Sequence, residues 1–117
     1  MPAAIDGFYA AYLTGAVGRG FALLECKKGH IVGADALGVL FDGEYTPGQD
    51  DTYQVTLKVK TPPNMPLIRG GSSSPQEEIR EQRFTLPADF YRREFIALDL
   101  GQGPINAKLV RIRETVD

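Results

Sequence analysis

A strict alternation over residues 52–60, TYQVTLKVK, is the feature that most constrains the fold of this chain. Apolar side chains occupy every second position, and polar or charged side chains lie between them. The apolar positions are Tyr53, Val55, Leu57 and Val59. Successive side chains of a β-strand point to opposite faces, so the segment predicts a strand with one buried and one solvated face.

Other short segments with strand character recur along the chain, separated by glycine and proline. They span residues 8–13, 20–26, 30–33, 38–45, 78–85, 94–100 and 105–113. No segment shows a helix of ten or more residues, and LPADFYRR favours only a short helical turn near residues 87–93. About eight strands with short connections predict an all-β fold, an antiparallel up-and-down β-barrel, because closure removes exposed strand edges.

Length and charge narrow the classes further. A chain of 117 residues fits a single domain, residues 1–117. It contains no run of about 20 apolar residues that would cross a membrane. The net charge is −2, which argues against direct nucleic-acid binding through clustered cations. Its first residues lack the basic region of a secretory signal, and its single cysteine cannot form an internal disulfide, so we expect a cytoplasmic protein.

The stretch GRGFALLECKKGHIVGADALG, residues 18–38, holds five glycines and the chain's only cysteine and histidine. It lacks the third glycine of a dinucleotide-binding motif, since Leu23 stands there. A β-hairpin with a Lys27-Lys28-Gly29 loop fits better, and it would place Cys26 opposite His30 as a thiolate–imidazole pair. Cys26 also keeps phase with Ala22 and Leu24, a pattern typical of a buried, unreactive thiol.

Nothing else in the sequence predicts chemistry at a catalytic or metal centre. One cysteine and one histidine do not make a ligand cluster, so no metal and no cofactor is expected. Asp35 and Asp42 each lie next to or near a glycine, where a short carboxylate commonly bonds the backbone of a turn. We therefore expect a protein that is not an enzyme.

The order of motifs in the first half of the chain resembles the GrlR-type family of negative regulators of type III secretion. The opening DGFYAAYL, the hairpin GRGFALLECKKGHIVGAD and the later GEY carry this resemblance. The matching positions are Asp6, Gly7, Tyr9, Gly18, Gly20, Gly29, Ile31, Gly33, Ala34, Asp35 and Gly43. The resemblance implies a lipocalin-like barrel, a homodimer, and a cytoplasmic bacterial regulator that binds a transcriptional activator rather than DNA.

The family's exposed acidic tetrapeptide, which contributes to partner recognition, corresponds here to residues 46–51, TPGQDD. This segment has two acids instead of four, so Gln49, Asp50 and Asp51 are candidate partner-binding residues, and capping of a polar turn is an equal alternative.

The runner-up function is a carrier of a small apolar ligand, with Tyr53, Val55, Leu57 and Val59 lining the barrel interior. A long loop from Thr61 to Pro75, rich in proline, glycine and serine, is expected to be either functional or a tolerated insertion.

Overall fold

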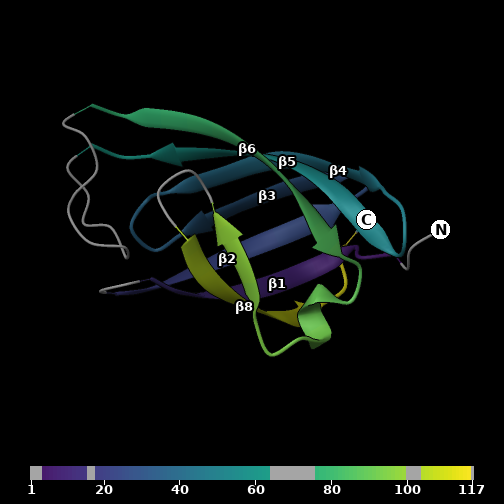
Figure 1. Ribbon diagram of the computed structural model, residues 1–117. Coiled ribbons are helices and arrows are strands. Elements are labelled where there is room, and N and C mark those ends of the chain that lie inside the picture. Colours follow the sequence, from purple (N-terminus) through teal and green to yellow (C-terminus); the bar gives the residue numbers. More distant parts are fainter. Residues whose placement is uncertain (1–3, 16–17, 64–75, 100–103, 117) are drawn as a thin grey trace.

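The protein forms one antiparallel sheet of eight strands, shown in Figure 1 as a computed structural model. The structure describes residues 4–15, 18–63, 76–99 and 104–116. The elements are β1 (Gly7–Thr14), β2 (Arg19–Lys27), β3 (His30–Asp35), β4 (Leu40–Pro47), β5 (Thr52–Thr61), β6 (Glu78–Pro87), the 3-10 turn η1 (Phe90–Arg92), β7 (Ile96–Asp99) and β8 (Pro104–Arg113). The all-β class and the short helical turn are confirmed. Most of the expected loop from Thr61 to Pro75 lies outside the described residues.

The strand order is β6-β5-β4-β3-β2-β1-β8-β7, and every described pair is antiparallel. All consecutive strands are neighbours in the sheet except β6 and β7, which lie at its two ends, and β8 pairs with β1. The up-and-down order is confirmed. The sheet curls strongly (Figure 1), and residues from both of its outer strands, β6 and β7, line the same interior cavity. No pairing joins β6 to β7 among the described residues, so the barrel retains one open seam instead of the complete closure expected from the sequence.

The core follows from the alternation along the strands. Tyr53, Val55, Leu57 and Val59 of β5 are all buried, as the sequence predicts. Tyr9 of β1 is the largest fully buried side chain, with 1% of its surface exposed. Its hydroxyl donates a 2.7 Å hydrogen bond to the carbonyl oxygen of Ile5, and its ring centroid lies 5.0 Å from that of Phe90 in η1. Because Phe90 is buried and Tyr91 is half-buried, η1 packs into the core mainly through Phe90.

Two glycines allow neighbouring strands to pack closely. A Cβ added at Gly33 of β3 would overlap the carbonyl oxygen of Leu23 and the side chain of Leu24 on β2. A Cβ at Gly43 of β4 would overlap the carbonyl oxygen of Thr56 on β5. Glycine within a strand marks such close backbone approaches and sharp bends, so both residues permit the curvature of this sheet.

Candidate functional site

The Cys26–His30 pair that the sequence raised does not form. β2 and β3 are joined by the two-residue turn Lys28-Gly29, whose φ angles are 51° and 85°. Positive φ at both central residues is the geometry of a type I′ hairpin turn, which matches the twist of the flanking strands. The turn pairs Lys27 with His30 and Cys26 with Ile31, one residue away from the three-residue loop expected above. The single shift places Cys26 on the inner face and His30 on the outer face.

The thiol of Cys26 is also electronically unsuited to nucleophilic chemistry at neutral pH. Burial, with a smaller contribution from the negative charges of Asp6 and Glu25, raises its pKa to about 12. The thiolate is the nucleophilic form of cysteine, and this environment disfavours it. Cys26 therefore serves as a packed interior residue, which was the second interpretation of its sequence position.

The same interior makes the protein sensitive to alkali. Burial is the main cause of the raised pKa of Cys26 and of the raised pKa values of Tyr9, Tyr45 and Tyr53. Unfolding returns thiol and phenol to ordinary pKa values of roughly 8.5 and 10, so the unfolded state ionises first as pH rises. Stability is then fully present below about pH 8.5 and falls above it. We expect the midpoint of thermal unfolding to be several degrees lower at pH 10.5 than at pH 7.5; equal midpoints would contradict this.

The acidic residues near glycines have separate roles. Asp35 accepts hydrogen bonds through Oδ1 from the backbone N–H groups of Leu37 and Val39, at 2.8 and 2.9 Å. It thus shapes the turn between β3 and β4, as its sequence position indicates. Asp42 instead lies exposed in the middle of β4, in register with Val32 and Lys58. The described residues contain no group of three or more histidine, cysteine or acidic side chains that could hold a metal ion.

The barrel interior holds a cavity of about 80 Å³ whose lining is entirely apolar. Of the four β5 residues suggested as pocket lining, Val55 and Leu57 line this cavity, whereas Tyr53 and Val59 do not. Three small residues, Ala11, Ala22 and Ala107, contribute to the lining and leave the space unfilled. The volume is well below the roughly 300–1,000 Å³ of ordinary ligand pockets.

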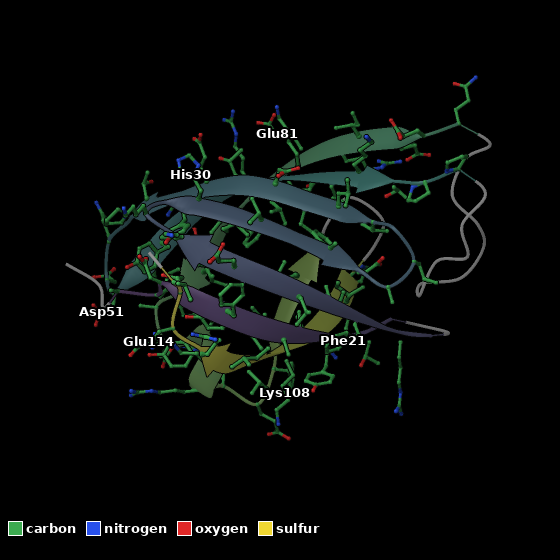
Figure 2. The ribbon with its side chains drawn as sticks, turned by 180° about the vertical axis from the view of Figure 1, so that it is seen from behind. Phe21, His30, Asp51, Glu81, Lys108 and Glu114 are labelled. Carbon is green, nitrogen blue, oxygen red and sulfur yellow. The ribbon has the colours of Figure 1, made fainter. Side chains whose placement is uncertain are left out.

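A larger polar cleft of about 550 Å³ lies at one end of the barrel and contains two of the predicted partner-binding residues. Its lining comes from the β4–β5 turn and from the segment around η1: Asp50, Asp51, Thr52, Pro87, Ala88, Asp89, Tyr91, Arg92 and Arg93. Gln49 lies outside this lining, and its carbonyl oxygen accepts a 2.5 Å hydrogen bond from the Thr52 hydroxyl. Figure 2 shows Asp51 at this end, well away from Phe21 and Lys108.

Backbone contacts fix the two walls of the polar cleft to each other. The N–H of Ala88 donates a 2.9 Å hydrogen bond to the carbonyl oxygen of Asp51. Asp50 and Asp51 both have φ of 56°, an uncommon conformation for non-glycine residues, in which Asp is among the better tolerated. Neither carboxylate bonds a described residue, so side-chain capping of the turn, the alternative raised from the sequence, is not seen among the described contacts.

The basic side of the cleft is partly neutralised. Arg93 pairs with Asp89 at 2.8 Å, and the guanidinium of Arg92 lies 5.6 Å from the centre of the Tyr91 ring. Nothing in the local sequence around Arg92 and Arg93 predicts that they lie beside the acidic turn at Asp50 and Asp51. The two segments meet because the chain that follows β6 lies beside the β4–β5 turn. A local sequence pattern cannot predict this contact.

A third feature, which we call the outer apolar patch, covers the outside of strands β8, β1, β2, β3 and β4. It comprises Tyr12, Phe21, Leu23, Val32, Leu40, Val110 and Ile112, all exposed. One row crosses these five strands in direct register, through Val110, Ala10, Leu23, Ala34 and Leu40. Beside that row, the rings of Tyr12 and Phe21 lie 5.3 Å apart. The sequence contains one signal of this patch: the segments FALLE and KLVRI carry apolar residues on both faces of their strands.

The adjoining outer face of strands β3 to β6 is more polar. His30 and Glu81 project from it, whereas Phe21 and Lys108 project from the side of the outer apolar patch (Figure 2). His30, Asp42, Glu44, Lys58 and Glu81 line a shallow hollow there. This polar hollow adjoins the outer apolar patch, because Val32 belongs to the patch and also lines the hollow.

Comparisons with protein-family models, with curated proteins and with solved structures found no match to this chain. Within the part of the chain that the structure describes, no helix is long and apolar enough to cross a membrane.

Proposed function

We propose that this protein is a non-enzymatic regulator that binds and sequesters a protein partner such as a transcriptional activator, in the manner of the secretion regulators it resembles. The polar cleft carries the proposal of partner capture, because Asp50 and Asp51 expose two carboxylates there. The outer apolar patch supports the homodimer, because contiguous exposed apolar patches commonly mark protein–protein contacts. The buried thiol and the small interior cavity are consistent with the proposed function.

The outer apolar patch is assigned to a homodimer. A two-fold interface uses the same surface on both subunits, so an exposed apolar sheet face can pack against its own copy. Replacing Leu23, which is 49% exposed in the central row, by Glu should convert the dimer to a monomer. Size-exclusion chromatography with light scattering measures this directly.

The matched control for the dimer is Ile79→Glu. Ile79 is 64% exposed on β6, outside the patch, so the same change in chemistry there should leave the dimer intact. A Leu23→Glu protein that remains dimeric, or a wild-type protein that is monomeric at micromolar concentration, would remove the dimer from the proposal.

Partner capture is assigned to the polar cleft. Asp50 and Asp51 offer two exposed carboxylates with no described partner, which suits a basic segment of the activator. Pull-down from the native cytoplasm, with mass spectrometry of bound proteins, identifies that activator. The Asp50→Ala, Asp51→Ala double variant should bind it about two- to thirtyfold more weakly, the range for two surface charge pairs.

The control for capture removes two carboxylates that line the separate hollow and not the cleft, through Asp42→Ala and Glu44→Ala. This variant changes the net charge equally, so a similar loss of affinity in both variants would indicate a general electrostatic effect and contradict a local site. Unchanged affinity in the Asp50, Asp51 variant would also contradict it. The carrier function has less support, because the interior cavity is only about half the ~150 Å³ of a cavity that holds benzene.

A further inference from the structure

The outer edge of β6 is not paired with any described strand. β6 pairs with β5 along its whole length, from Glu78 with Thr61 to Pro87 with Thr52, and the sheet order ends there. In an antiparallel ladder, every second residue of an edge strand directs its N–H and C=O groups away from its neighbour. Such an edge is a template for a further strand.

Only part of this edge carries the features that protect against strand addition. The inner face of β6 begins with polar side chains, since Arg80 lies opposite Val59 and Gln82 opposite Leu57. Arg80 is also held by Glu78 at 3.0 Å. Inward-pointing charges of this kind discourage edge-to-edge pairing. The following inner residues, Phe84 and Leu86, are apolar, so protection ends where the strand reaches the core.

The apolar interior cavity extends to this unprotected part of the edge. Phe84 and Leu86 of β6 line the cavity together with Phe90 of η1 and Leu98 of β7. Phe84 and Leu98 are only half-buried, and they come from the two strands that border the open seam. The cavity therefore reaches the surface between β6 and β7.

The cavity has the size of one aliphatic side chain. Its volume of about 80 Å³ is roughly half that of a cavity which holds the six carbons of benzene, so it suits about three carbon atoms. An isopropyl group, as in valine or at the end of leucine, meets this size and the wholly apolar lining. A free ligand of ordinary size does not fit.

The apolar cavity and the polar cleft are adjacent at the end of β6. Leu86 lines the cavity, whereas the next two residues, Pro87 and Ala88, line the cleft that holds Asp50 and Asp51. A segment extended along β6 would thus pass from an apolar socket to two exposed carboxylates within a few residues. A partner segment that fits both sites has an aliphatic residue for the apolar cavity and basic residues, before or after it, for the polar cleft.

We propose that the open seam binds an extended segment of the protein partner as an added strand along β6, with one Val or Leu side chain filling the interior cavity and basic residues facing Asp50 and Asp51. This inference rests on the proposed function and specifies the partner segment that the regulator recognises. Main-chain hydrogen bonds supply affinity in such strand addition, and the side-chain socket supplies specificity.

The test uses the full chain and a phage library of random nine-residue peptides. Selection should enrich peptides with a Val or Leu among β-forming residues and with Lys or Arg nearby. An enriched peptide, made synthetically, should slow hydrogen exchange of backbone amides between Arg83 and Leu86 by tenfold or more. The Ala107→Leu variant, which fills the cavity, should bind it at least tenfold more weakly, whereas Ala36→Leu on an exposed turn should bind it normally.

Folding of Ala107→Leu is checked by its unfolding midpoint, and Ala22→Val is the milder substitute if that midpoint collapses. Peptides that bind filled-cavity and wild-type proteins equally, or that protect no β6 amide, overturn the inference. The inference is also overturned if the β6 amides are already protected without peptide. Protection that appears only in the dimer would assign the edge to a second copy, and protection in the monomer would assign it to the chain itself. If the peptide experiment fails but an activator is captured and its binding still depends on Asp50 and Asp51, the proposed function stands. Failure to recover any activator overturns that function independently.

Discussion

Replacing Tyr9 by alanine is expected to lower the free energy of unfolding by about 3–5 kcal/mol, the usual cost of removing a large aromatic side chain from a core. Tyr9 is 1% exposed and packs against Phe90 and Tyr91, with ring centroids 5.0 and 6.0 Å away. The variant therefore loses both its own packing and the attachment of η1 to the sheet. Urea denaturation followed by far-UV circular dichroism measures the loss.

Tyr9→Phe is the matched control for that experiment. It keeps the ring but removes the hydroxyl that donates to Ile5, leaving a buried carbonyl without this partner at a cost of about 1–3 kcal/mol. The alanine variant must be clearly less stable than the phenylalanine variant. Equal stabilities would mean that the hydrogen bond, and not the ring packing, is the larger contribution.

Alanine at Gly33 or Gly43 is expected to destabilise the protein by roughly 2–3 kcal/mol despite adding only one methyl group, because overpacking at this scale strains the backbone. In each case the new Cβ meets a carbonyl oxygen of the adjacent strand, Leu23 or Thr56, which cannot move away as a flexible side chain can. The expected signs are a lower urea midpoint and more signal broadening in NMR spectra around β3 and β4.

The opposite substitution at the next residue, Ala34→Gly, provides the comparison. Ala34 is exposed on the outer face, so its loss should cost about 0.5–1 kcal/mol through backbone entropy alone. If Gly33→Ala costs no more than Ala34→Gly, then the close approach of β2 and β3 does not constrain the sheet as described.

Strand positions were predictable from the sequence because alternation and punctuation are local signals. The segment 52–60 lies within β5, and the expected segment 105–113 lies within β8. The hairpin register at residues 27–30 was not predictable, because Lys28 in a positive-φ conformation makes a two-residue turn where lysine gives no such signal. One residue of register decided whether Cys26 and His30 share a face.

The candidate sites depended on contacts that no local pattern contains. The turn at Asp50 and Asp51 was visible as an acidic turn, but its position beside Arg92 and Arg93 arises only from the curled sheet. The residues behind the family resemblance proved to be architectural. Tyr45 donates a 2.9 Å hydrogen bond to Asp6, Tyr9 bonds Ile5, and Asp35 holds its turn. These contacts explain why such motifs inform the fold more directly than the partner.

The pairing of β1 with β8 has a consequence for synthesis in the cell. The guanidinium of Arg111 donates a 2.8 Å hydrogen bond to the carbonyl oxygen of Asp6, across 105 residues of sequence. A ribosome produces β1 through β6 long before β8 leaves its exit tunnel, so the growing chain carries an unsealed strand edge in what becomes the interior of the sheet. Completion of this domain is therefore tied to the synthesis of β8, and any pause before β8 emerges prolongs a state open to aggregation or to chaperones.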